Sequence, residues 1–251
     1  MPFATVAGHS LEYEWIDGAE PTLVFLHEGL GSIRQWRDFP AQVAAATGCR
    51  TLMYNRYGYG NSDVLAESRV SVRFMHDEAL VALPGLLVKL KIDSPVLVGH
   101  SDGASIALIY AGAGHPARGL ALMAPHVFVE DIGLRSIERV RQQFETTDLP
   151  QRLGRYHRDA RRTFYLWNDA WLDPQFRHWN IEEYLPSVSV PVLAIQGQDD
   201  EYGTMAQLRS IGERVKGSCE LLDLADCGHA PYRDQPQAVL AALARFVDGL
   251  A

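Results

Sequence analysis

The chain is predicted to fold as an α/β protein with a mostly parallel, twisted sheet that helices cover on both faces. Short apolar runs such as residues 22–26 and 95–98 show no alternation with polar residues, which is typical of strands buried on both faces. Segments with helical spacing of apolar residues lie between such runs, and strands that alternate with helices favour a parallel sheet. The 251 residues, 47% of them hydrophobic, suffice for one large domain or for a domain with an insertion.

The composition argues against several classes of protein. The net charge is −8 and no run of basic residues occurs, so nucleic acid is not an expected partner. No apolar run is long enough to span a membrane, and residues 1–5 lack the charged and apolar regions of a signal peptide. The three cysteines are an odd number without metal-ligand spacing, which favours a reducing, cytoplasmic location.

The expected elements of the N-terminal half follow one another in the order of an α/β fold. Strands are predicted at 2–6, 11–15, 22–26, 51–54, 95–98 and 120–124. Helices are predicted at 36–47, 72–90 and 104–110. Gly48 is the expected end of the first helix, and Pro84 with Gly85 is the expected kink in the second.

The alternation of strands and helices breaks after Pro125. Residues 126–186 are polar, aromatic and rich in arginine, with helical stretches at 137–144 and 153–167 and no clear strand. We therefore predict a core formed by 1–125 and 187–251, and a helical cap inserted at 126–186. The core resumes with a strand at 190–195, a helix at 204–215, a strand at 219–224 and a helix at 235–247.

A Gly-x-Ser-x-Gly pentapeptide, Gly99-His100-Ser101-Asp102-Gly103, joins a predicted strand to a predicted helix. Small residues on both sides of the serine allow a sharp turn without steric clash. Such a turn holds the serine hydroxyl above the edge of the sheet, at the positive end of a helix. The context therefore makes Ser101 a candidate nucleophile.

A serine hydroxyl is a poor nucleophile unless a neighbouring base takes its proton, and a histidine oriented by a carboxylate can do so near neutral pH. His229 follows the last predicted strand, and Asp200 follows the end of the strand before it. Both are expected at the same sheet edge as Ser101. Nucleophile, acid and base then occur in the chain order of one known fold.

Together these segments resemble the α/β-hydrolase superfamily over nearly the whole chain. The matching pieces are Leu26-His27-x-Gly29-x-Gly31-Ser32, residues 55–62, the pentapeptide at 99–103, Gly197-x-x-Asp200 and Gly228-His229. Within the superfamily the chain is most similar to small bacterial, cofactor-free serine hydrolases with a short helical cap. The resemblance implies the α/β-hydrolase fold, with Ser101 as nucleophile, His229 as base and Asp200 as the orienting acid.

The resemblance also implies an oxyanion hole made by the backbone amides of Gly29 and Asp102. Such fixed donors are worth roughly 3–4 kcal/mol each in comparable sites. The family usually has glycine where this chain has Glu28. A carboxylate aimed at the oxyanion hole would oppose the developing negative charge, so Glu28 is expected either to turn away toward the backbone or to contact substrate.

Two alternatives exist for the orienting acid. Asp199 competes with Asp200, which the Gly197-x-x-Asp200 spacing favours. Some members of the superfamily instead take the acid from the segment after the sixth strand, where Glu130 and Asp131 stand in this chain.

Five residues are candidate contacts to substrate. They are Glu28, Trp36, His126, Trp167 and Trp171. Three of these residues also have a structural interpretation, because Trp36 can be a core aromatic and Trp167 and Trp171 can pack the cap onto the core.

The predicted function is hydrolysis of a small ester, lactone or related carbonyl compound through an acyl-enzyme on Ser101, with no metal ion and no organic cofactor. One alternative is cleavage of a C–C bond in aromatic degradation by the same triad, although such relatives carry a longer glycine run than Gly29 and Gly31. Another is a non-catalytic member of the fold that holds a ligand. The expected partner is a small-molecule substrate, and the chain is expected to be a monomer or a homodimer.

Overall fold

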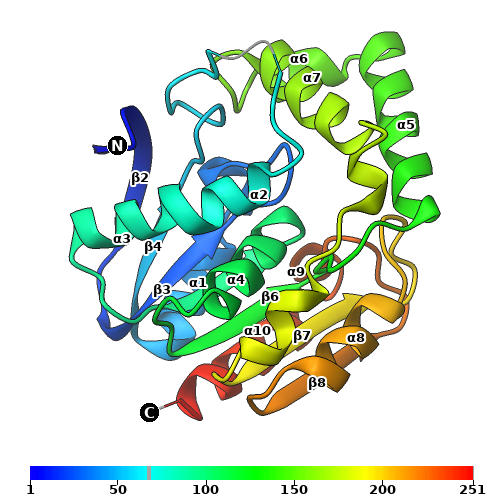
Figure 1. The fold of residues 1–251 in the computed structure, drawn as a ribbon. Helices are drawn as coiled ribbons and strands as arrows, with labels where there is room; N and C mark the ends of the chain where they lie inside the picture. Colours follow the sequence, from blue (N-terminus) through cyan, green and yellow to red (C-terminus); the bar gives the residue numbers. More distant parts are fainter. Residues whose placement is uncertain (67–68, 251) are drawn as a thin grey trace.

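An eight-stranded sheet forms the centre of the computed structural model, which describes residues 1–66 and 69–250 (Figure 1). Its strands run across the sheet in the order β1-β2-β4-β3-β5-β6-β7-β8. The pairs β1–β2 and β2–β4 are antiparallel, and all other neighbours are parallel. The strands are β1 (Phe3–Val6), β2 (His9–Ile16), β3 (Ala19–Leu26), β4 (Cys49–Tyr54), β5 (Val96–His100), β6 (Gly119–Met123), β7 (Val192–Gly197) and β8 (Cys219–Leu224).

Helices cover both faces of this sheet. The core helices are α1 (Phe39–Thr47), α2 (Phe74–Asp77), α3 (Leu83–Leu90), α4 (Asp102–Gly112), α8 (Ala206–Arg214), α9 (Pro231–Asp234) and α10 (Pro236–Asp248). One hydrophobic cluster joins one face of the sheet to α3, α4 and α8, and another joins the opposite face to α1 and α10. Along β3, Leu23 and Phe25 enter one cluster while Val24 and Leu26 enter the other, as the two-residue period of a strand requires. The predicted mostly parallel sheet with helices on both faces is confirmed.

A helical insert, defined here as the chain between β6 and β7, lies beyond one end of the sheet (Figure 1, green to yellow). It contains α5 (Asp131–Thr146), α6 (Leu149–Leu153), α7 (Ala160–Trp171) and the 3₁₀ turns Phe176–His178 and Glu182–Ser187. Its contacts with core loops include a hydrogen bond of 2.7 Å from Thr163 Oγ1 to the Gly58 carbonyl. His157 Nδ1 accepts from the Gly60 amide, and its Nε2 lies 3.0 Å from the Leu30 carbonyl. The domain boundaries at 125/126 and 186/187 stay a prediction.

Two of the predicted helices are interrupted in the structure. Trp36, the expected start of the first helix, instead ends a separate 3₁₀ turn, Ile33–Trp36, and α1 begins at Phe39. The predicted helix at 72–90 is continuous over 74–90, and a π-helical turn, Glu78–Ala82, lies directly before the expected kink at Pro84. The predicted helix at 153–167 divides because Asp159 accepts a hydrogen bond from the Arg162 amide and starts α7 as a new helix.

The last predicted helix, at 235–247, is confirmed as α10, which spans Pro236–Asp248. A short helix, α9, precedes it, and Pro236 begins α10. Among the described residues, no helix is long and apolar enough to cross a membrane.

Glycines allow α4 to pack directly against the backbone of the sheet. A Cβ added at Gly103 would lie 2.0 Å from the Leu26 carbonyl oxygen, and one added at Gly99 would lie 2.5 Å from the Gly103 carbonyl oxygen. Neither contact can be relieved by rotating a side chain, because the opposing atoms belong to the backbone. The pentapeptide therefore needs glycine at both ends to keep Ser101 at the strand-to-helix turn.

We expect Gly103→Ala to lower the free energy of unfolding by about 3 kcal/mol, because the methyl group forces α4 away from β3. Chemical denaturation of the purified variant measures this. The matched control is Gly154→Ala at the end of α6, where φ is −60° and the added Cβ has only ordinary contacts at 3.4 Å. The control is expected to change stability by less than about 1 kcal/mol, and equal effects at the two positions would contradict the argument.

Candidate active site

Ser101 occupies the sharp turn between β5 and α4. Its backbone has φ 52° and ψ −118°, a conformation that is strained for a residue with a side chain. The Ser101 amide donates a hydrogen bond of 2.9 Å to the Met123 carbonyl on β6, which fixes the turn to the sheet. The side chain is thus held at the sheet edge, at the N-terminal end of an 11-residue helix.

His229 lies in the loop after β8 and bridges Ser101 and Asp200. Its Nε2 is 2.9 Å from Ser101 Oγ, and its Nδ1 is 2.9 Å from both carboxylate oxygens of Asp200. A carboxylate facing Nδ1 favours the tautomer with the proton on that nitrogen. The lone pair of Nε2 then faces the serine hydroxyl, as a general base requires.

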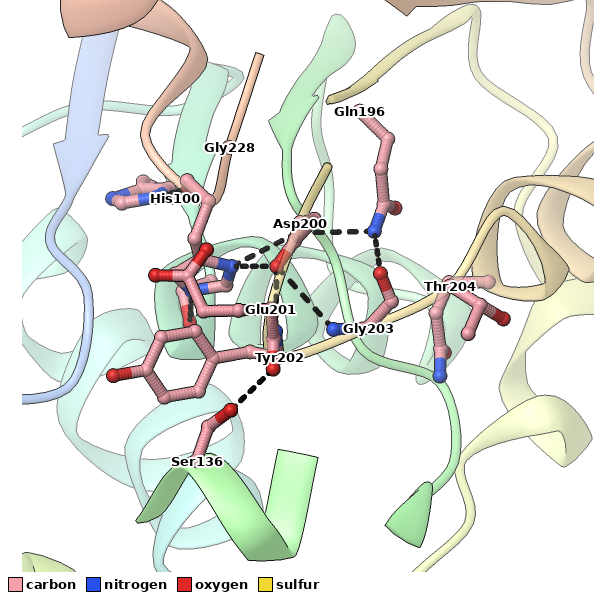
Figure 2. A network of polar contacts seen from close by, with 12 residues as sticks. His100, Ser136, Gln196, Asp200, Glu201, Tyr202, Gly203, Thr204 and Gly228 are labelled. Atoms are coloured by element: carbon pink, nitrogen blue, oxygen red, sulfur yellow. Dashed lines mark hydrogen bonds and ion pairs between the residues drawn. The ribbon is translucent and has the colours of Figure 1, made fainter. Parts of the chain in front are cut away.

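Asp200 is held by a second set of hydrogen bonds, shown at the centre of Figure 2. Gln196 Nε2 donates to it at 3.0 Å, and the amides of Tyr202 and Gly203 donate at 2.8 and 3.3 Å. Burial alone would raise the pKa of this carboxyl, but the charge and hydrogen bond of His229 and the Tyr202 amide lower it below its ordinary value. Asp200 is therefore an anion throughout the pH range in which His229 gains or loses its proton.

The alternative acids lie elsewhere. Asp199 is exposed, and it is Asp200 that the turn directs inward. The Glu130 carboxylate accepts hydrogen bonds from the amide and hydroxyl of Thr204, and Asp131 pairs with Arg177 at 2.5 Å. The structure brings Asp200, and not these three carboxylates, to His229.

The charge of Asp200 controls the protonation of His229. Burial alone lowers the pKa of His229, but the Asp200 carboxylate and its hydrogen bond outweigh this and hold the pKa above its ordinary value of about 6.5. The imidazole is thus a stronger base than a free histidine, and its protonated form is stabilised inside the protein.

The two predicted oxyanion amides, those of Gly29 and Asp102, belong to residues that line one cavity with Ser101. Asp102 is the first residue of α4, so its N–H is one of the unpaired donors at a helix N-terminus. Gly29 lies in the loop after β3, which is held through the Glu28 carbonyl. That carbonyl accepts hydrogen bonds from the Gly31 amide at 3.0 Å and from Arg56 at 2.9 Å.

The Glu28 carboxylate faces His100 and Arg233. Its oxygens lie 3.5 Å from His100 Nδ1 and 3.7 Å from the Arg233 guanidinium. Burial alone would raise the pKa of Glu28, yet these two neighbours lower it to about 2, so the group is an anion. His100 Nε2 in turn lies 2.7 Å from the His229 carbonyl. Glu28 therefore forms part of the cavity wall and also links the oxyanion loop to the His229 loop through His100.

A cavity of about 410 Å³ opens over Ser101 between the core and the helical insert. His126 lines it, with its ring centroid 5.6 Å from that of His229 and 5.4 Å from that of Trp171. Burial and the neighbouring His229 lower the pKa of His126 to about 3, so its ring is neutral at physiological pH. Trp167 and Trp171 of α7 also line the cavity.

Trp36 lies in the core and not in this cavity, which corrects the expectation that it contacts substrate. Its side chain is 2% exposed and packs against Phe25 and Tyr232, with ring centroids 5.3 and 4.9 Å away. The 3₁₀ turn that carries it directs the ring under the sheet, into the cluster shared with α1 and α10.

The sequence analysis missed several residues of the cavity. Tyr202 is one, with its ring centroid 4.5 Å from that of His229, and it follows Asp200 by two positions in the same loop. Ile137 and Val140 supply the apolar wall from α5, where they belong to an apolar stripe with Phe144 on an otherwise polar helix. Arg233 enters from α9. Proximity to Asp200 was a usable signal for Tyr202, whereas the others depend on the path of the insert and of α9.

No group of three or more histidine, cysteine, aspartate or glutamate side chains within residues 1–66 and 69–250 is arranged to hold a metal ion.

The fold and the arrangement of Ser101, His229 and Asp200 are those of an α/β hydrolase. Residues 23–243 match the model of the alpha/beta hydrolase family, and the chain belongs to that family. A proline iminopeptidase of Levilactobacillus brevis is 30% identical over 128 residues, which are 50% of this chain and 42% of that enzyme. That match thus spans less than half the length of the relative.

Two other relatives match over most of their length. The 2-succinyl-6-hydroxy-2,4-cyclohexadiene-1-carboxylate synthase of Salmonella paratyphi C is 24% identical over 263 residues, covering 90% of this chain and 94% of that enzyme. The crystal structure of the enol-lactonase from Burkholderia xenovorans LB400 has a TM-score of 0.76 at 20% identity and covers 98% of this chain and 100% of that chain. The latter likeness shows a shared fold.

We expect Asp200→Asn to reduce kcat by about 10⁴-fold, because an amide favours the wrong imidazole tautomer. In the wild type, kcat/KM is expected to rise with pH through a value above about 6.5, where His229 loses its proton. Without the Asp200 charge the pKa of His229 falls, so this rise moves to lower pH. The measurement is the pH profile of kcat/KM for a p-nitrophenyl ester.

Asp199→Asn is the matched control, since Asp199 is exposed and adjacent to Asp200. It is expected to change kcat by less than about threefold and to leave the pH profile in place. A larger loss at Asp199 than at Asp200 would contradict the assignment of the acid.

Proposed function

We propose that this protein is a serine hydrolase that cleaves a small ester, lactone or related carbonyl compound through an acyl-enzyme on Ser101. The observation that carries the proposal is the unbroken chain of short contacts from Ser101 Oγ through His229 to Asp200, each 2.9 Å long. Nucleophile, base and orienting acid at these distances are the arrangement that activates a serine hydroxyl.

The reaction begins when Ser101 Oγ attacks the carbonyl carbon while His229 Nε2 takes the hydroxyl proton. The negative charge that develops on the carbonyl oxygen is stabilised by the amides of Gly29 and Asp102. His229 then donates the proton to the leaving oxygen, and the bond between carbonyl carbon and leaving group breaks. Water attacks the acyl-enzyme with His229 again as base, which releases the acid and restores the Ser101 hydroxyl.

The charges around the site suit this sequence. Asp200 stabilises the imidazolium that forms during each attack, because it stays an anion and keeps its hydrogen bonds. His126 is neutral, so it adds no competing positive charge beside His229. The Glu28 anion is paired with Arg233 and His100, which reduces its repulsion of the developing oxyanion.

The cavity supports a small substrate. Its volume of about 410 Å³ falls near the lower end of the range of small-molecule sites, and Leu30, Ile137 and Val140 give it an apolar wall. An ester and a C–C bond next to a carbonyl both present the group that Ser101 attacks. Parallel assays of p-nitrophenyl esters, lactones and a vinylogous 1,5-diketone separate these classes.

We expect Ser101→Ala to remove nearly all hydrolysis of a p-nitrophenyl ester while circular dichroism shows an intact fold. His229→Ala should cost about as much as Ser101→Ala, and the double variant little more, because members of a triad act as a unit. A serine-reactive fluorophosphonate should label the wild type and not Ser101→Ala. Near wild-type turnover of Ser101→Ala would overturn the mechanism, and an unlabelled wild type would favour a ligand-binding protein.

Trp167 is expected to limit the length of the acyl group. It lines the cavity over Ser101 and also a second cavity of about 450 Å³ bounded by α2 and the loops after β1 and β4, so its indole lies between the two. Trp167→Ala should join them and shift the ratio of kcat/KM for long and short esters at least tenfold toward the long ester, since each buried methylene is worth about 1–3 kcal/mol. Trp171→Ala is the comparison, because Trp171 lines the first of these cavities and not the second. An unchanged ratio in Trp167→Ala would mean that this tryptophan does not limit the length of the acyl group.

A further inference from the structure

The indole N–H of Trp167 is a buried hydrogen-bond donor without an acceptor in the part of the chain that the structure describes. The side chain is 8% exposed and lines the cavity with Ser101, Gly29 and Asp102. Buried donors are normally paired, because water has been removed and nothing else compensates for its loss. An unpaired donor in the wall of a cavity is therefore a group that a ligand can satisfy.

The nitrogen edge of this indole lies directly against the oxyanion loop. A Cβ built on Gly29 would be 2.1 Å from Trp167 Nε1, closer than to any other atom of the ring. No side chain larger than hydrogen fits between the Gly29 backbone and the indole. The N–H of Trp167 is consequently presented next to the residue whose amide is the proposed oxyanion donor.

The position of the indole is fixed by bonds on the same helix. Thr163, one turn before Trp167 on α7, donates to the Gly58 carbonyl at 2.7 Å and ties this face of the helix to the core. Asn168 Nδ2 donates to the Ile137 carbonyl at 3.1 Å and ties the neighbouring face to α5. A donor held in this way needs no reorganisation when charge develops beside it.

We propose that the Trp167 indole N–H is a third donor to the substrate oxygen that becomes negative, alongside the amides of Gly29 and Asp102. Trp167 is then a catalytic residue supplied by the helical insert, and Gly29 lacks a side chain because the indole occupies that space. This inference rests on the proposed function, since the oxyanion exists only if Ser101 attacks a carbonyl. The insert then contributes a hydrogen-bond donor to the reaction and also shapes the cavity.

The first test is Trp167→Phe, which keeps an aromatic ring and removes the N–H. Because the hydrogen bond forms in the transition state, kcat and kcat/KM for a short ester should fall together by about 10- to 100-fold while KM is unchanged. Trp179→Phe is the matched control. Trp179 is also 8% exposed with an unpaired indole nitrogen, but it packs on Phe176 and is absent from the cavity wall, so this variant should match the wild type.

The second test observes the hydrogen bond directly. The chain has five tryptophans, so a ¹⁵N-labelled sample gives five indole N–H signals, and Trp167 is assigned by comparing variants of the individual tryptophans. A trifluoromethyl ketone forms a tetrahedral adduct with Ser101 that carries an oxyanion. On adduct formation the Trp167 N–H signal should move downfield and the Trp179 signal should stay in place. This measurement uses the wild-type protein, so it decides the matter even if Trp167→Phe does not fold.

The outcomes separate this inference from the proposed function. A Trp167 signal that does not respond to the adduct, or a Trp167→Phe variant with wild-type kcat, overturns the role of the indole while leaving the serine mechanism intact. Hydrolysis that persists in Ser101→Ala overturns the serine mechanism and the inference with it. A loss in Trp167→Phe that appears only as a higher KM would also overturn the inference, because it would show ground-state binding and not stabilisation of the oxyanion.

Discussion

The direct packing of α4 on the backbone of the sheet is the constraint on which the rest of the site depends. Gly99 and Gly103 let the helix approach until Gly103 faces the Leu26 carbonyl, and Ser101 between them takes a strained positive φ. That strain persists because the Met123 carbonyl and the helix N-terminus over-determine the turn. Closeness to β3 also places the first amide of α4 beside the loop that carries Gly29. One packing contact thereby sets the positions of the nucleophile and of both proposed oxyanion amides.

Two carboxylates act on the His229 loop, one directly and one through a second histidine. Asp200 contacts the imidazole directly and raises its pKa, while Glu28 acts on the loop through His100, whose Nε2 lies 2.7 Å from the His229 carbonyl. Glu28 stands where the family usually has glycine. Its negative charge faces the guanidinium of Arg233 and not the amides of the proposed oxyanion hole. The departure from the family pattern therefore connects the oxyanion loop to the base without adding an unpaired charge to the cavity.

The helical insert is joined to the core by polar contacts as well as by apolar packing. Thr163 and His157 bind backbone groups of the loops after β3 and β4, and Phe144 and Phe164 stack at 3.7 Å inside the insert. These contacts fix α7 over the oxyanion loop with Trp167 against Gly29. Selectivity and oxyanion stabilisation, as proposed, then arise from the same helix, so a change that loosens the insert affects both.

The sequence by itself determined the fold class and the order in which strands and helices follow one another along the chain. It also placed Ser101, Asp200 and His229 at strand ends, because apolar runs and glycine spacing are local signals. Tertiary structure decided that Trp36 belongs to the core and that Tyr202 and Arg233 reach the cavity. These features depend on which side chains come into contact when distant segments of the chain pack together. The partners of Glu28 and the contact of Trp167 with Gly29 join residues far apart in the chain, and no local pattern encodes such distances.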